Sequence, residues 1–173
     1  MRKVVKFGGS SLASAEQFKK VGNIIRSDES RCYVVPSAPG KRNSRDTKVT
    51  DLLYGCYGKA AEGKDFSGNL KEIKERYYEI IQGLGLNLSL EEEFQVIEEK
   101  FKEQAGRDYA ASRGEYLNGI IMAEYLGYTF IDAATVIRFD KNGVFDPEKT
   151  DRLLGKALSK NEKAVVPGFY GAK

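Results

Sequence analysis

The stretch VVKFGGSS, residues 4–11, decides how the fold of this chain is interpreted. Val4 to Phe7 is a short run with high β propensity, and it stops abruptly at Gly8 and Gly9. The apolar residues from Phe18 to Ile25 recur three and four positions apart, which predicts that a helix follows. A strand that passes through a glycine-rich turn into a helix is a typical opening unit of an α/β fold. Such a turn is also a common place for a ligand.

The rest of the chain repeats this alternation of strands and helices. We expect further strands over residues 31–35, 129–132, 135–139 and 164–166, and further helices over residues 49–61, 109–126 and 147–158. The last helix should begin at Asp146-Pro147, where Asp can cap and Pro can occupy the first helical position. Strands that alternate with helices predict a single α/β domain with a mostly parallel sheet covered on both faces.

Two amphipathic helices interrupt this alternation. Their apolar stripes comprise Leu70, Ile73, Tyr77, Ile80, Ile81 and Leu84 in the first helix and Leu90, Phe94, Ile97 and Phe101 in the second. Ser89 followed by Glu92 is a capping-box pattern and predicts the start of the second helix. The turn at residues 83–87 contains two glycines and predicts an antiparallel helical hairpin that packs onto its own domain. The charged run over residues 91–103 should be the solvated face of the second helix.

The charge composition excludes several classes of function. The chain has 28 basic and 25 acidic residues, a net charge of +3, which is too small for a nucleic-acid binder that relies on bulk charge. It has no histidine, so it has no Ser-His-Asp triad, no His-ligated metal and no imidazole proton shuttle. If the chain is part of an enzyme, its chemistry must rely on Lys, carboxylates, hydroxyls and backbone N–H groups.

Neither the cysteines nor the apolar runs indicate a secreted or membrane protein. Cys32 and Cys56 have neither metal-ligand nor redox spacing, and we expect both to be buried thiols of the core. The N-terminus does not fit a signal peptide, and no apolar run approaches the length of a membrane span. These features predict a soluble, cytoplasmic protein.

The glycine-rich turn is the strongest candidate for a binding site. Gly8 and Gly9 have no side chains, so phosphate oxygens can approach their backbone N–H groups, and the helix that this turn is expected to open adds partial positive charge. Lys6 supplies a full charge, and Ser10 or Ser11 supplies a hydroxyl. The alternative is an ordinary glycine-rich turn with a solvated Lys, and spacing alone does not separate the two.

Two further segments carry residues that suit a small charged ligand. In Ser112-Arg113-Gly114-Glu115, small neighbours would let a ligand approach Glu115, which could receive an ammonium group or could equally be a surface residue. The loop from Pro36 to Lys41, with Thr47 and Thr50 beyond it, follows a strand and should lie at the same sheet edge as the glycine-rich turn. Its hydroxyls and basic residues suit an anionic small molecule, and the alternative is a mobile surface loop.

Two other motifs are rejected. Residues 58–65 nearly match a P-loop, but Asp65 replaces the required hydroxyl and the segment ends a helix instead of following a strand. Residues 140–151 imitate a calcium-binding EF-hand loop, but Phe145 stands where the turn needs glycine.

Six segments, taken in order, resemble the aspartokinase branch of the amino acid kinase family. They are Lys6–Ser11, Val34–Lys41, Val49–Leu53, Ser112–Glu115, Asp132–Ile137 and Val165–Gly171. Six motifs in family order over the whole chain are far more specific than any one alone. Pro36 is a small departure, because the family usually runs from the Val pair directly into Ser-Ala. The resemblance implies a three-layer αβα sandwich with a mainly parallel sheet, with the helical hairpin as an insertion.

The resemblance also implies an activity and the residues that carry it. The activity is transfer of the γ-phosphoryl group of ATP, with Mg²⁺ accompanying the nucleotide, to the side-chain carboxylate of L-aspartate. The product, 4-phospho-L-aspartate, leads to lysine, threonine and methionine. By this analogy, the phosphates are held by Lys6, Phe7, Gly8, Gly9 and Ser10, with Lys6 in the catalytic role. Aspartate is bound by Thr50 and Glu115, the latter through the amino group, with Ser37 and Phe169 as weaker assignments. No residue is assigned to a metal.

Several alternatives stay open. Other members of the family act on glutamate, acetylglutamate, carbamate or UMP, although the Ser112–Glu115 segment and the long helical hairpin favour aspartate. A non-catalytic small-ligand or regulatory module would bind without turnover, and a purely structural interaction protein is disfavoured by the three polar loops. The resemblance implies a homo-oligomer for the full-length protein. Its oligomeric state, its feedback inhibitor and the nucleotide-base site are not specified by the sequence.

The family pattern continues beyond the motifs found here, with a catalytic Asp, the nucleotide-base site and regulatory domains. We therefore expect residues 1–173 to be the N-terminal, amino-acid-substrate lobe of the kinase domain. We predict that these residues alone do not catalyse formation of aspartyl phosphate, because half of the phosphoryl-transfer machinery is missing. The measurement is ATP-dependent aspartyl hydroxamate formation. A signal that is absent from a Lys6→Ala control would overturn this expectation.

Overall fold

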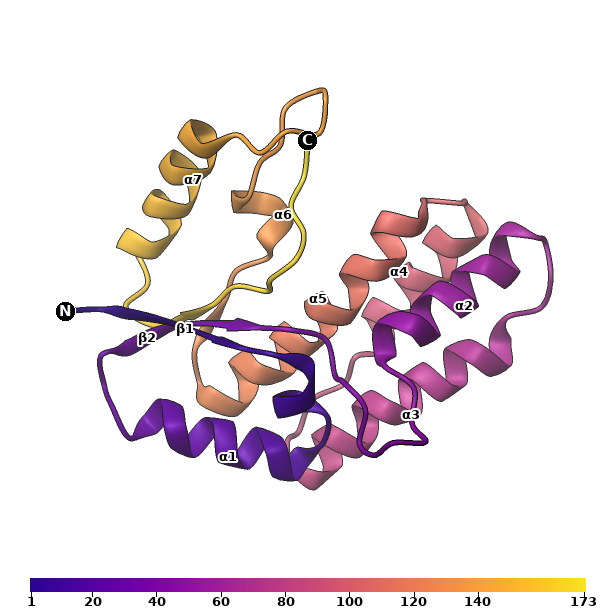
Figure 1. Ribbon diagram of the computed structural model, residues 1–173, viewed down its shortest axis with the longest axis horizontal. Coiled ribbons are helices and arrows are strands. Elements are labelled where there is room, and N and C mark those ends of the chain that lie inside the picture. The colour runs from indigo at the N-terminus through magenta and orange to yellow at the C-terminus, as the bar shows by residue number, and fades with distance from the viewer.

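The computed structural model describes residues 1–173, and its centre is a four-stranded parallel sheet (Figure 1). The strands are β1 (Lys3–Phe7), β2 (Arg31–Pro36), β3 (Thr129–Phe130) and β4 (Ala164–Val165), and they lie in the order β1-β2-β4-β3. Lys6 pairs with Val35, and Val165 pairs with both Val34 and Phe130. The mainly parallel α/β sheet predicted from the sequence is confirmed.

The helices begin and end largely where the sequence pattern predicts. They are the 3₁₀ turn η1 (Gly9–Leu12), α1 (Ala15–Arg26), α2 (Val49–Ala61), α3 (Ser67–Gly83), α4 (Glu91–Lys102), α5 (Arg107–Leu126), α6 (Ala133–Val136) and α7 (Pro147–Ser159). As predicted, Asp146 caps α7 by accepting a hydrogen bond from the Lys149 N–H, and Pro147 occupies the first turn. Helix α5 ends at Gly127, whose φ of 69° is left-handed and therefore favours glycine.

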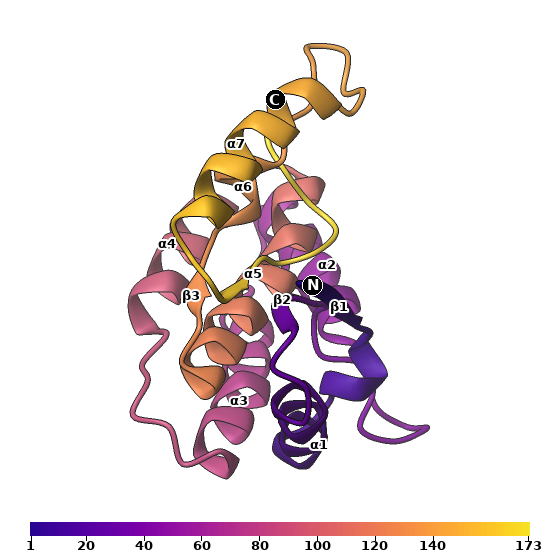
Figure 2. The same cartoon turned by 90° about the vertical axis from the view of Figure 1, so that its left-hand side faces the viewer.

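The sheet lies between two layers of helices, with α1 on one side and α7 on the other (Figures 1 and 2). Because successive side chains of a strand point to opposite faces, Val34 and Val165 join the core shared with α1 and α5. Tyr33 and Ala164 face the smaller core beneath α6 and α7. This arrangement is the three-layer αβα sandwich that the family resemblance implied.

Helices α2, α3, α4 and α5 pack together beside the sheet (Figure 1). The predicted hairpin is present: Phe66, just before α3, meets Phe101 near the end of α4, and Tyr77 of α3 meets Phe94 of α4 with their ring centroids 6.1 Å apart. These side chains are buried, so the hairpin is part of the main hydrophobic core. The charged residues of α4 are mostly exposed, as expected for its solvated face.

Two local predictions are wrong. Residues 135–139 do not form a strand, because α6 occupies 133–136; Asp132 caps it by accepting a hydrogen bond from the Ala134 N–H, and the two alanines favour helix. The Ser89–Glu92 capping box does not form either. The N-cap of α4 is Leu90, which is fully buried and donates its N–H to the Tyr78 hydroxyl. The leucine side chain is buried in the core at the start of this helix, and the Ser89 hydroxyl accepts from the Glu91 N–H at 3.3 Å in place of the Glu92 N–H that the capping box requires.

The cysteines behave as core residues. Cys32 and Cys56 are both buried and unbridged, as predicted. Burial raises the pKa of the Cys56 thiol to about 12, which keeps it protonated and unreactive. Among the helices, none combines the length and the apolar character needed to span a bilayer.

The close approach of α5 to the sheet provides a test of the packing. A Cβ at Gly119 would lie 2.6 Å from Cγ of Pro167 and 3.0 Å from the ring of Phe130, whereas a Cβ at the exposed Gly155 of α7 would meet nothing within 4 Å. We expect Gly119→Ala to lower the free energy of unfolding by about 1–3 kcal/mol through overpacking. Gly155→Ala should raise it by up to about 1 kcal/mol. Urea unfolding measures both, and a stabilising Gly119→Ala would contradict this packing.

Candidate functional site

Three loops meet at the carboxyl ends of the parallel strands. The Ser37 N–H donates to the carbonyl of Phe7 at 3.0 Å, which ties the loop after β2 to the end of β1. The Gly168 N–H donates to the carbonyl of Pro36 at 3.2 Å, which brings in the segment after β4. This edge of a parallel sheet is where α/β proteins commonly bind ligands. The prediction that the first two loops share one edge is confirmed.

The glycine-rich loop presents free donors. The backbone N–H groups of Gly8, Gly9 and Ser10 make no hydrogen bond within the chain. Lys6 precedes them and is exposed, so a full positive charge is available beside three amides. This combination suits the oxygens of a phosphate group. One part of the prediction is wrong: the loop enters η1, and α1 begins only at Ala15, after a cap by Ser14, so the α1 dipole does not start at the glycines.

Gly9 and Gly40 bring two of these loops into backbone contact. The Gly40 N–H donates to the carbonyl of Gly9 at 2.8 Å. A Cβ on Gly40 would lie 2.6 Å from the carbonyl carbon of Gly9, and a Cβ on Gly9 would lie 2.8 Å from the carbonyl oxygen of Ala38. Any side chain at either position would push the loops apart. Both glycines are therefore required by this contact.

Glu115 is buried beneath the loop after β2. It lies on α5 with 7% of its surface exposed, and its Oε2 atom has no hydrogen-bond partner. The preceding Gly114 allows this approach, because a Cβ there would lie 2.8 Å from Cβ of Ala38. Burial raises the pKa of Glu115, and the backbone N–H groups of Ala38 and Glu115 and the charge of Lys6 oppose that shift. The structure thus rejects the alternative of a surface residue.

Asn118 is a candidate site residue that the sequence analysis missed. It lies one turn after Glu115, is fully buried and donates from Nδ2 to the carbonyl of Ser37 at 2.7 Å. Its Oδ1, like Oε2 of Glu115, has no partner. Buried acceptors are normally satisfied, so these two oxygens on one helix face are suited to a ligand that donates hydrogen bonds. A polar residue between Leu117 and Gly119 inside a helix was the available signal.

The remaining predicted residues lie around this centre. Ser37 is half-buried and is held through its carbonyl by Asn118. Thr50 is half-buried in the first turn of α2, directly after Val49, whose N–H donates to the carbonyl of Pro39 at 3.1 Å. The first turn of α2 thus lies against the loop after β2.

Phe169 lies at the margin of the candidate site. The residue is 73% exposed, and its φ of 76° is left-handed, which is strained for a residue with a side chain. It borders an apolar groove of about 300 Å³ beside Val35 and a second cavity of about 760 Å³ beside Ser112 and Arg113. Neither cavity includes Glu115. The structure therefore does not bring the ring of Phe169 to the buried carboxylate.

A glycine-rich turn with free amides and a buried carboxylate thus lie at one edge of a parallel α/β sheet. The whole chain, residues 1–173, matches the Amino acid kinase family, so the chain belongs to that family. Among curated proteins, it is 36% identical to Aspartokinase 3 of Bacillus subtilis over 98% of this chain and 40% of the relative. It is also 30% identical to an aspartokinase of Chlamydia trachomatis, again over 98% of this chain and 40% of the relative.

Solved structures agree with these matches. The crystal structure of the Clostridium acetobutylicum aspartate kinase superposes with a TM-score of 0.94 and 49% sequence identity, over 98% of this chain and 39% of that enzyme. The E. coli aspartokinase III structure, solved with aspartate and ADP, has a TM-score of 0.76 at 22% identity and supports the fold alone. The chain spans about two fifths of the length of these aspartokinases.

The buried carboxylate makes a testable contribution to stability. Because the pKa of Glu115 is raised from its ordinary value of 4.5, the folded chain holds this proton to a higher pH than the unfolded chain. The stability contributed by protonated Glu115 is fully present below pH 4.5, and it is lost as the pH rises through the raised pKa. The free energy of unfolding of the wild type should therefore fall relative to that of Glu115→Gln over this window.

Urea unfolding at a series of pH values from about 4 to about 8 measures this difference. Glu124→Gln, on an exposed part of the same helix, is the control for loss of one carboxylate. A wild type that gains stability relative to Glu115→Gln as pH rises would show that the carboxylate is stabilised, not penalised, by its surroundings.

Proposed function

We propose that this chain forms the aspartate-binding and phosphate-holding lobe of an aspartate kinase. The observation that carries the proposal is the pair of orphaned buried acceptors, Glu115 Oε2 and Asn118 Oδ1, close to a loop with three free amides and Lys6. An ammonium group is a donor that such acceptors suit, and a phosphate is the anion that such amides suit. When an amino acid receives a phosphoryl group, its ammonium group and the transferred phosphate must lie in one site. The 49% identity to the Clostridium enzyme supports aspartate as that amino acid.

The reaction requires positioning and charge neutralisation. A carboxylate oxygen of the aspartate side chain attacks the γ-phosphorus of ATP and forms a new P–O bond. The bond from that phosphorus to the β,γ-bridging oxygen breaks, and ADP leaves with the electron pair. The nucleophile is already ionised at neutral pH, so no proton has to be removed. A chain without histidine can therefore contribute fully to this chemistry.

Each group of the site has a defined task in this scheme. The free N–H groups of Gly8, Gly9 and Ser10 and the ammonium of Lys6 hold the transferring phosphates and offset the negative charge that repels the nucleophile. Glu115 and Asn118 bind the amino group of aspartate, and Ser37 and Thr50 lie in segments that border it. Substrate binding supplies the positive charge that makes burial of the Glu115 carboxylate favourable. Phe169 has no assigned task in this proposal, because its ring does not reach Glu115.

The residues present fit the phosphates of ATP but not a protein-held metal. The chain contains no group of three or more His, Cys, Asp or Glu residues that could hold a metal ion. Mg²⁺ in this proposal arrives with the nucleotide phosphates, which are its customary ligands. A cytoplasmic homo-oligomer is the form we propose for the whole enzyme.

Ligand binding tests the proposed role of Glu115. We expect L-aspartate to bind to the chain, and N-acetyl-L-aspartate, which lacks the ammonium group, to bind at least about tenfold more weakly because a charge-assisted hydrogen bond is lost. In Glu115→Gln, the affinity for L-aspartate should fall by a similar factor, while the affinity for N-acetyl-L-aspartate should change little. Isothermal titration calorimetry with both ligands and both proteins completes the cycle.

The same titrations separate the competing family members. L-glutamate and N-acetyl-L-glutamate serve as the alternative ligands, and Glu124→Gln serves as the matched control on α5. Preference for N-acetyl-L-glutamate would show that the amino group is not recognised and would replace aspartate with an acylated substrate. Equal weakening of both aspartate ligands by Glu115→Gln would contradict an ammonium contact.

A further inference from the structure

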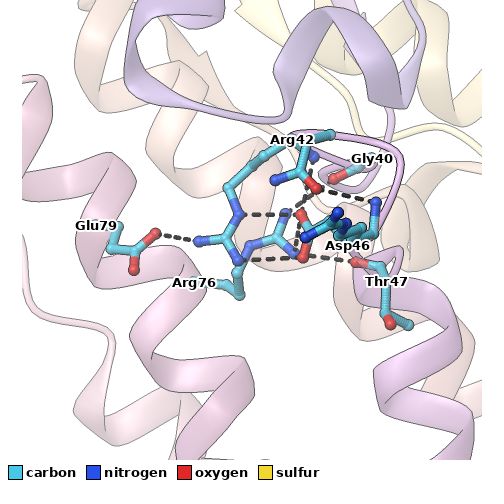
Figure 3. Close-up of polar contacts among 8 residues, drawn as sticks. Gly40, Arg42, Asp46, Thr47, Arg76 and Glu79 are labelled. Carbon is cyan, nitrogen blue, oxygen red and sulfur yellow. Dashed lines mark hydrogen bonds and ion pairs between the residues drawn. The ribbon is translucent and has the colours of Figure 1, made fainter.

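Arg76 is a buried arginine outside every segment that the family motifs cover. It lies in the middle of α3 with 4% of its surface exposed. Its guanidinium donates from Nη2 to the carbonyl of Gly40 at 2.8 Å and from Nη1 to the carbonyl of Thr47 at 3.0 Å (Figure 3). These carbonyls stand near the two ends of the loop between β2 and α2. One side chain therefore ties both ends of that loop to α3.

Asp46 provides the counter-charge for this contact. Its Oδ2 lies 3.0 Å from Nη1 of Arg76 and 2.9 Å from Nε of Arg42, and Arg42 also donates to Oδ1 at 3.1 Å (Figure 3). Arg42 extends the network to Glu79 of α3, 2.6 Å away. The pKa of Asp46 is held well below its usual range by the hydrogen bond from Arg42, against the effect of burial. The carboxylate thus stays ionised and keeps the loop folded over Arg76.

The contact with Gly40 reaches the glycine-rich loop. The carbonyl of Gly40 accepts from Arg76, while its N–H donates to the carbonyl of Gly9, both at 2.8 Å. The peptide groups on both sides of Gly40 are therefore fixed, one by α3 and the other by the candidate phosphate loop. The next residue of α3, Tyr77, donates its hydroxyl to the carbonyl of Gly114 at 2.8 Å, directly before Glu115. Two consecutive residues of α3 thus hold the two halves of the site.

We propose that Arg76 is a positioning residue that sets the distance between the loop carrying Ala38–Gly40 and the buried Glu115. It touches neither aspartate nor phosphate, and acts by fixing Gly40, against which Gly9 packs. Loss of the guanidinium frees this loop, so that the ligand must order it on binding. The proposal rests on the proposed function only for the identity of the ligand, because the contact itself concerns the chain alone.

The test compares three variants of the chain with the wild type. Arg76→Met keeps most of the buried aliphatic part of the side chain but removes all hydrogen-bond donors. Arg76→Lys keeps the charge, but its single ammonium cannot reproduce the planar pair of hydrogen bonds to Gly40 and Thr47. Ile97→Ala, in the buried face of α4, lowers stability without touching the loop and is the matched control. Two quantities are measured. One is amide exchange at Gly40, whose N–H binds Gly9, and at Val49, whose N–H closes the loop at Pro39. The other is the Kd for L-aspartate.

We expect Arg76→Met to accelerate exchange at both amides and to weaken aspartate binding by about tenfold, with Arg76→Lys in between. Ile97→Ala should lower the unfolding midpoint and leave the aspartate Kd unchanged. If the aspartate Kd of Arg76→Met is within twofold of that of the wild type, the positioning role is wrong. It is also wrong if Ile97→Ala raises the Kd as much as Arg76→Met does.

Two further outcomes keep the experiment decisive. If Arg76→Met does not fold, Asp46→Asn replaces it, because that substitution removes the counter-charge from a partly exposed position and should also speed exchange at Gly40. If the wild type does not bind aspartate, the proposed function fails. The exchange rates of Gly40 and Val49 then still show whether Arg76 holds the loop.

Discussion

The contact between the backbones of Gly9 and Gly40 is the constraint on which the rest of the site depends. It joins the loops after β1 and β2, and it leaves no space for a Cβ on either residue. The free amides of the first loop and the Ala38 segment of the second are thereby brought to one edge of the sheet. The parallel pairing of β1 and β2 supplies the frame, because it points both carboxyl ends in the same direction. Helix α3 then holds the second loop through Arg76, and it holds α5 at Gly114 through Tyr77.

The site keeps polar groups in positions that cost stability. Glu115 and Asn118 are buried with oxygens that lack partners, and the Nε atom of Arg76 is also unsatisfied. A buried acceptor without a donor costs about 1–3 kcal/mol. In the proposed function, these oxygens are the acceptors that the substrate satisfies. The well-packed hairpin and the apolar core of α2–α5 offset that cost.

Much of the fold could be predicted because the signals were local. Helix α2 has the predicted bounds, and Asp146-Pro147 marks the start of α7 as expected. The predictions that failed were those in which a second signal outweighed the first, a neighbouring helix cap in one case and a long-range contact in the other. Residues 135–139 contain β-branched residues, yet the Asp132 cap and the alanines produce α6. Leu90 displaces Ser89 as the N-cap because its side chain is drawn into the core.

The sequence by itself determined the alternation of strands and helices, the glycine-rich turn after the first strand and the family motifs, because these depend on periodicity and on residues that are neighbours in the chain. The tertiary structure alone decided that Glu115 is buried and unpartnered, that Asn118 belongs beside it, and that Arg76 holds the loop at Gly40 and Thr47. These facts depend on which backbone groups approach each side chain across the fold. Spacing along a chain carries no information about that approach, since burial and unpaired hydrogen bonds exist only after packing.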